Sequence, residues 1–340
     1  MAITESDRNY LLPKAKQAEV KRTATFPQIL QMLAPAGALL AALILHLTLP
    51  NVYPKGYQSV TYPAFLKTCL GIYMIFGLAA FLLPKLRAKM LYLSWLLTAA
   101  VLLVAALDMA TLKTGHFRLP FVPSPDKILS SVTSNLETLA VSLYFSMKLL
   151  FTGIVIGIIS GMISGILLGW SQICNYWFMP VLKMIGPVPS AAWLPIVMVL
   201  FATSRQASVF LIVLSIWFPL TLMVSSAIRD TDKRLVETAR VLGASEVYIM
   251  LHVALPAALP AMFTGLFMGL SSSFSALIIA EMLGVEAGLG WYIKWAEAWG
   301  EYAKIFSTVG IFIIIFFILM DTLFRLRNRL LKWQKGTVRW

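Results

Sequence analysis

The sequence is poor in charge, and acidic residues are the scarcest charged type. Only 13% of its 340 residues are Asp, Glu, Lys or Arg, with 15 acidic against 28 basic side chains. Soluble domains average about 25% charged residues, so this deficit excludes an ordinary soluble domain. Hydrophobic residues make up 59% of the chain, and its mean hydropathy is +0.81. This composition predicts a protein that crosses a membrane several times.

Residues that commonly bind metals or do covalent chemistry are also scarce. The two cysteines, Cys69 and Cys174, lie in separate apolar segments, and the three histidines (His46, His116 and His252) are far apart. Neither set has the spacing of a metal site, so we expect no metal and no cofactor on this chain. The motifs GxxxxGK(S/T), HExxH, CxxC and GxSxG are all missing. The chain is therefore not expected to be an enzyme.

Acidic residues within the apolar runs are few. Asp108, Glu281 and Asp321 lie towards the ends of their runs. A carrier driven by protons or sodium relies on acidic residues inside the membrane. The sequence gives such a carrier little to work with, so the energy for any transport has to come from elsewhere.

Apolar stretches long enough to cross a bilayer dominate the chain. A hydrocarbon core of about 30 Å requires about 20 apolar residues in a helix. We therefore predict an all-α polytopic membrane protein with about eight transmembrane helices. Their approximate ranges are Met32–Pro50, Thr68–Leu83, Met90–Thr111, Leu139–Trp170, Met184–Thr203, Ala207–Ile228, Ala261–Leu283 and Ile305–Leu323.

Positive charges are unevenly distributed between these spans. With the N-terminus inside, the cytoplasmic segments hold eighteen Lys and Arg residues and the opposite segments hold eight, leaving out Lys148 and Lys183 near span ends. Positive charge is retained on the cytoplasmic side, so both termini of this multi-pass inner (plasma) membrane protein are expected there. The net charge of +13 then reflects orientation. Membrane lipid is an expected partner; nucleic acid is not, because no basic patch interleaved with aromatics is present.

A proline-rich segment separates two parts of the chain. Pro120, Pro123 and Pro125 fall within six residues, and Ser124-Pro125-Asp126 favours the start of a short surface helix. We predict four parts: a cytoplasmic N-terminal tail (1–31), a three-span module (32–118), a C-terminal core (119–333) and a cytoplasmic C-terminal tail (334–340).

Three patterns in the core predict helix packing or a polar path. The fourth span has a glycine at every fourth position, which permits close helix packing or sliding during gating. Prolines in the fifth span predict a plain kink or an irregular helix near a pathway. Serines in the seventh span either line a polar path or bond back to their own helix. The residues are Gly153, Gly157, Gly161, Gly165 and Gly169; Pro187, Pro189 and Pro195; Ser271, Ser272, Ser273 and Ser275.

The segment Arg229–Pro256 is the most charged part of the core. Eight ionisable residues fall between Arg229 and Glu246. Each would cost about 2.5–3.5 kcal/mol at a bilayer centre, so the segment has to lie in water. Its pattern predicts one helix, capped by Asp230 or Thr231 and ended by Gly243, and a second helix from Ser245 to His252.

This segment resembles the EAA loop of permeases of ATP-binding-cassette importers. That pattern, E-A-A-x3-G-x9-I-x-L-P, is matched in spacing by Glu237-Thr238-Ala239, Gly243 and Val253-x-Leu255-Pro256, with Thr238 and Val253 as departures. The flanking RLVETARVLGAS, LPAALPAMFTGL, AEMLG and GLGWYI resemble the nitrate, sulfonate, taurine and bicarbonate branch of that family. The similarity covers about Leu119 to Trp333, and the first three spans are additional to it.

The resemblance implies a type I importer permease core with extra N-terminal spans. It implies a dimer, expected to be a homodimer, with two ATPase subunits that bind ATP and magnesium, and an external, periplasmic or lipid-anchored binding protein. Alternating access would move a small solute, expected to be an anion such as nitrate, a sulfonate, taurine or bicarbonate. The loop would supply the coupling helix, through Glu237, Thr238, Ala239, Gly243, Leu255 and Pro256.

Two other functions are compatible with the same sequence. A membrane scaffold or sensor could recruit a cytoplasmic partner through residues 229–256. An ion-coupled secondary carrier would move its solute without ATP, and its uptake would persist after ATP depletion.

Overall fold

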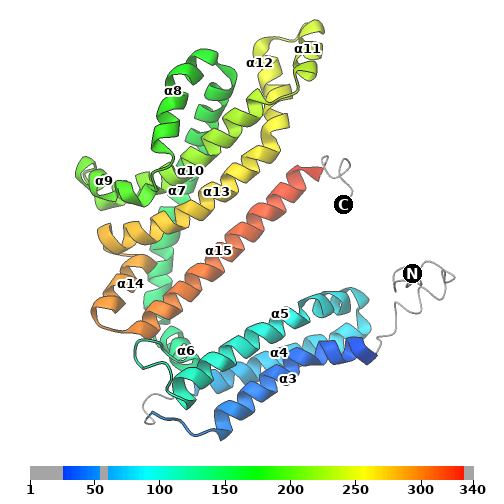
Figure 1. The fold of residues 1–340 in the computed structure, drawn as a ribbon, viewed down its shortest axis with the longest axis vertical. Helices are drawn as coiled ribbons and strands as arrows, with labels where there is room; N and C mark the ends of the chain where they lie inside the picture. Colours follow the sequence, from blue (N-terminus) through cyan, green and yellow to red (C-terminus); the bar gives the residue numbers. More distant parts are fainter. Residues whose placement is uncertain (1–25, 54–59, 333–340) are drawn as a thin grey trace, which may run out of the picture. The chain divides into compact units, whose positions relative to one another are not determined.

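The computed structural model describes residues 26–53 and 60–332, which fold entirely into helices and their connections (Figure 1). The expected tails, 1–31 and 334–340, lie outside these residues, except that 26–31 begin the first helix. The chain divides into two compact units, Met1–Ser134 and Asn135–Trp340. Among the described residues, seven helices are long and apolar enough to cross a membrane, and one bent helix pair makes up to eight. The predicted all-α membrane fold is confirmed.

In the part of the first unit that the structure describes, residues 26–53 and 60–134, there are three long helices and one short one. They are α3 (Phe26–Thr48), α4 (Thr61–Leu82), α5 (Pro84–Asp108), which continues into a π-helical turn (Met109–Lys113), and α6 (Pro125–Ser134). Helix α6 starts at the expected Pro125 and packs on α4 and α5. Leu39, Ala42, Tyr62 and Leu66 form a buried cluster between the long helices.

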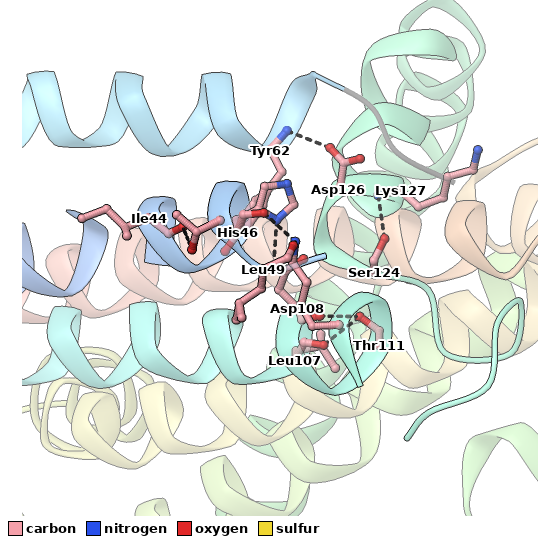
Figure 2. Close-up of polar contacts among 12 residues, drawn as sticks. Ile44, His46, Leu49, Tyr62, Leu107, Asp108, Thr111, Ser124, Asp126 and Lys127 are labelled. Carbon is pink, nitrogen blue, oxygen red and sulfur yellow. Dashed lines mark hydrogen bonds and ion pairs between the residues drawn. The ribbon is translucent and has the colours of Figure 1, made fainter. Parts of the chain in front are cut away.

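Charged side chains satisfy helix ends within the first unit (Figure 2). Lys113 Nζ donates to the carbonyls of His46 and Leu49 at the end of α3. Asp126 Oδ1 accepts the Tyr62 amide, 2.9 Å away, in the first turn of α4. Helix ends leave such groups unpaired, and a cation suits the C-terminus whereas an anion suits the N-terminus. Asp108 Oδ2 lies 2.8 Å from His46 Nδ1, so these two side chains pair with each other.

The second unit contains the remaining helices, and α10 lies at its centre between α7 and α13 (Figure 1). Side chains of α10 such as Leu211, Ile216 and Leu220 are fully buried. The helices are α7 (Leu136–Trp170), α8 (Gln172–Ile185), a 3₁₀ turn (Ser190–Trp193), α9 (Leu194–Leu200), α10 (Ser204–Arg229), α11 (Lys233–Val241), α12 (Glu246–Ile249), a π-helical turn (Met250–Ala254), α13 (Leu255–Gly284), α14 (Leu289–Ala298) and α15 (Tyr302–Leu330).

The glycine stripe of α7 is the surface on which α10 packs. A Cβ at Gly153 would lie 2.4 Å from Ile212 Cγ2, and one at Gly169 would lie 2.8 Å from Ile228 Cβ. Gly157, Gly161 and Gly165 meet Ile216, Leu220 and Val224 in the same way, always with an offset of 59 positions. A constant offset means that α7 and α10 run parallel and in register. The stripe serves close packing, one of the two readings that the sequence left open.

The parallel register decides how the chain passes between α7 and α10. Both helices end on the same side, so α8 and α9 together have to cross back. They do so as one span broken by 90° between Ile185 and Ser190. The predicted bounds Met184–Thr203 begin too late, because the crossing starts at Gln172, whereas the irregularity expected from the prolines is present as the bend at Gly186–Pro189. Pro187 and Pro189 each disfavour a helical residue before them, which explains the break.

Alanine at Gly153 tests the packing of α7 on α10. Gly153→Ala should lower the free energy of unfolding by about 1–3 kcal/mol, because its methyl group overlaps Ile212. Thermal unfolding in detergent measures this. Gly310→Ala in α15 is the control, since nothing lies within 4 Å of its Cβ position. Equal unfolding temperatures for both alanine variants would contradict the packing.

Candidate functional site

The charged segment forms a two-helix hairpin that begins where α10 ends. Asp232 is the N-cap of α11, and its Oδ1 accepts the Arg234 amide at 2.9 Å. The expectation of Asp230 or Thr231 as the cap is wrong, because both residues close α10 instead. The Asp230 amide donates to the Ser226 carbonyl, and Thr231 Oγ1 donates to the Ala227 carbonyl.

Gly243 ends α11 as predicted, in the left-handed conformation with φ of +85°. Its amide donates to the Arg240 carbonyl at 3.0 Å, and the Ala244 amide donates to the Ala239 carbonyl at 3.1 Å. This pair of bonds is the Schellman motif of a helix C-terminus. No atom lies within 4 Å of the place where a Cβ of residue 243 would be, so there is space for a side chain. Glycine is favoured here because of the left-handed backbone conformation.

The second helix of the hairpin is continuous with a membrane helix. Ser245 Oγ caps α12 by accepting the Tyr248 amide at 3.3 Å. The expected end at His252 is wrong, because the π-helical turn Met250–Ala254 carries the helix directly into α13. Glu246–Gly284 is thus one helical run of 39 residues. The hairpin is thus joined to α13 without a break in the helix.

The hairpin exposes an apolar patch among its charged side chains. No residue of α11 is buried, and Glu237 is exposed. Val241 is 88% exposed and Leu242 81%, and Leu235 and Val247 are also exposed. An apolar patch beside charged residues is typical of a surface that binds another protein.

A second candidate feature is a pocket of about 230 Å³ at the break between α8 and α9. Three hydroxyls line it, one each from the 3₁₀ turn, α10 and α13: Ser190, Ser215 and Ser272. Ser215 Oγ donates to Ser190 Oγ at 2.7 Å. No ionisable residue lines the pocket. The pocket can therefore form hydrogen bonds with a solute, and the pocket itself places no fixed charge beside that solute.

The four serines singled out in the sequence lie in different environments. Ser272 lines the pocket. Ser271 Oγ donates to the Phe267 carbonyl, and the buried Ser273 donates to the Leu270 carbonyl. Ser275 is exposed. Sequence reasoning missed Ser190 and Ser215; the prolines around Ser190 were the available signal.

Glu281 is a buried carboxylate that joins three helices, and it is 1% exposed. Its Oε2 accepts the Ser146 hydroxyl of α7 at 2.9 Å and the Gly290 amide of α14 at 2.8 Å. Ser146 Oγ in turn accepts the Leu289 amide at 2.8 Å. A Cβ at Gly288, where φ is +133°, would lie 2.5 Å from the carboxyl carbon. We refer to Ser146, Glu281 and Gly288–Gly290 as the clasp.

Helix α14, which follows the clasp, has one buried and one exposed face. Burial raises the pKa of Tyr292, and the negative charge of Glu301 raises that pKa further. On the exposed face Lys294 pairs with Glu297 at 3.0 Å. Lys304 pairs with Glu301 and lies 4.7 Å from the centre of the Trp295 ring.

Comparison with known proteins matches the second unit. Residues 153–332 match the family described as "Binding-protein-dependent transport system inner membrane component". SsuC of Escherichia coli (strain K12), named for aliphatic sulfonate transport, is 35% identical over 22% of this chain and 28% of its own. TauC of the same strain, a taurine transport system permease protein, is 28% identical over 46% of this chain and 59% of its own. The matches thus span less than two thirds of either relative.

Among solved structures, the chain matches one described as inward-facing conformations of the MetNI methionine ABC transporter. The TM-score is 0.49 and the identity is 17%, over 58% of this chain and 98% of that one.

Removing the Ser146 hydroxyl tests the clasp. Ser146→Ala should cost about 1–3 kcal/mol of stability, because it leaves the buried Leu289 amide without an acceptor and Glu281 with one donor fewer. Ser208→Ala is the matched control, since that buried hydroxyl bonds only to the Ser204 carbonyl of its own helix. Thermal unfolding of both variants measures the loss of stability. An equally large loss in Ser208→Ala would contradict the role of the clasp.

Proposed function

The chain belongs to the family of binding-protein-dependent transport system inner membrane components, the permease subunits of ATP-binding-cassette importers, and we propose that a separate ATPase drives it through residues 229–256. The observation that carries this proposal is the exposed hairpin α11–α12 that continues without a break into α13. A permease of this family is not itself catalytic. ATP and magnesium would therefore be bound by the partner subunit.

The hairpin supplies what a coupling element needs. Its apolar surface is uncovered, so a cleft on the ATPase can bury it. Asp232, Gly243 and Ser245 fix the two helices by caps, so the hairpin keeps its shape under load. Displacement of the hairpin by the ATPase would then be passed to α13, and the complex would alternate between inward-open and outward-open states.

The remaining parts of the assembly follow from the same family. We expect two copies of this chain, two ATPase subunits and an external binding protein that delivers the solute. The hairpin side would face the cytoplasm, in agreement with the excess of Lys and Arg there. Coupling would rest on Glu237, Thr238, Ala239, Gly243, Leu255 and Pro256.

The solute is proposed to be a small oxyanion of the sulfonate type. The relatives SsuC and TauC are named for sulfonate and taurine transport. The pocket at the α8–α9 break has hydroxyl donors and no acidic residue, so it suits the oxygens of such a group and repels none of them. We assign Ser190, Ser215 and Ser272 to the path of the solute.

Charge reversal at Glu237 tests the coupling role. Glu237→Lys should leave the protein in the membrane but abolish solute-stimulated ATP hydrolysis in the reconstituted complex, because an exposed charge of the docking surface is inverted. Glu137→Lys, in the first turn of α7 at the other end of the unit, is the control and should retain stimulation. If solute-stimulated ATP hydrolysis were undiminished in Glu237→Lys, the proposed coupling role would be wrong.

Neighbouring serines of α13 test the path. Ser272→Phe fills part of the pocket of about 230 Å³, so uptake into proteoliposomes should fall at least tenfold while the complex still assembles. Ser271→Phe changes a residue outside the pocket and should retain most uptake. The path would have to be placed elsewhere if the two variants transported equally well.

A further inference from the structure

A second, larger pocket of about 550 Å³ lies at the end of the second unit opposite the hairpin. Residues of α7, the start of α10 and the connection between α13 and α14 line it. Lys148 lies before Gly153 on α7, and Arg205 lies before Ile212 on α10, so both are near the beginnings of these parallel helices. The hairpin follows the ends of the same helices, after Gly169 and Ile228. In an importer this is the end at which the solute arrives.

Three charged residues line this pocket: Lys148, Arg205 and Glu286. Within the residues that the structure describes, none of the three side chains has an ion-pair or hydrogen-bond partner. The charged residues near α14 differ, because Lys294 pairs with Glu297 and Lys304 with Glu301. Two cations and one carboxylate are thus available to a molecule in the pocket.

The walls of the pocket are fixed by their neighbours. Thr203 caps α10 by accepting the Gln206 amide at 3.3 Å, which holds the positive end of that helix at the pocket. The wall Gly284–Ala287 lies between Glu281 and Gly288, both members of the clasp. The pocket is therefore held in shape from both sides without a ligand.

We propose that this pocket receives a small zwitterionic solute, with its oxyanion group on Lys148 and Arg205 and its ammonium group on Glu286. The inference rests on the proposed function and deepens it, because it narrows the solute class from oxyanions to oxyanions that also carry an ammonium group. A carboxylate in the pocket disfavours a simple anion and favours such a zwitterion. Exposed ion pairs are weak, so the pocket holds the solute loosely and passes it on.

The same chemistry occurs in the headgroup of phosphatidylethanolamine, which carries a phosphate and an ammonium group. The proposed occupant of the pocket is the solute and not this lipid. If the lipid were the occupant, it would compete with the solute for the pocket and weaken the binding of the solute.

The test compares two probes, 2-aminoethanesulfonate and ethanesulfonate, on the intact permease–ATPase complex without binding protein. Saturation-transfer NMR titrations in lipid-free detergent should give about 1.4- to fivefold tighter binding of 2-aminoethanesulfonate, the range expected for one exposed ion pair. Glu286→Gln should remove this preference. Lys148→Gln and Arg205→Gln should each weaken both probes by a factor in the same range, about 1.4- to fivefold. Lys183→Gln, an exposed lysine of α8 outside the pocket, is the control and should bind as the wild type does.

Three results would overturn the inference. Both probes could bind equally to the wild type, the three pocket variants could bind as the wild type does, or nanodiscs with phosphatidylethanolamine could abolish binding seen in nanodiscs without it. All three affected side chains are exposed, so unchanged thermal unfolding verifies that the variants fold. Failure here is distinct from failure of the proposed function, which would appear as missing solute-stimulated ATP hydrolysis by the wild type with its binding protein.

Discussion

The close approach of α10 to the glycines of α7 is the contact on which the second unit depends. Lipid tails are as apolar as leucine, so helices in a membrane associate through tight packing and not through escape from water. Gly265 and Gly269 of α13 extend the same principle to the other side of α10, where their Cβ positions lie 3.0 Å from Leu220 Cα and 2.9 Å from Ile216 Cα. Once α7, α10 and α13 are in register, the broken span, the hairpin and the clasp have fixed places.

Several helix ends in this protein are satisfied by side chains of other helices. Glu281 and Ser146 serve the first amides of α14, and in the first unit Asp126 and Lys113 serve the ends of α4 and α3. Backbone groups away from water have to be paired. A helix end closed by a distant side chain therefore fixes position as well as stability, which explains why so few buried charges are present yet each has a defined neighbour.

The sequence predicted the features that depend on local pattern. Apolar run lengths predicted the helices, and the predicted family is confirmed by the family match over residues 153–332. Gly243 was recognisable because a helix C-terminus favours glycine. The prolines of the fifth span predicted its irregularity, and the structure breaks the span by 90° there. Features that depend on tertiary contacts escaped prediction: the cap at Asp232 and the hydroxyls of Ser190 and Ser215. Asp230 and Asp232 were both possible N-caps of α11. Asp232 takes this position because Asp230 already closes the preceding helix, α10.

The unbroken run Glu246–Gly284 has a mechanical consequence. Its 39 residues span about 58 Å at 1.5 Å per residue. The run packs on α10 at both of its ends, through Ala258 beside Val224 and Ile228 and through Ala280 beside Leu211. Two helices joined at both ends move together. A push on the hairpin would therefore be carried by α10 and α13 as one body over the whole of that length, and it would arrive at the clasp without being absorbed on the way.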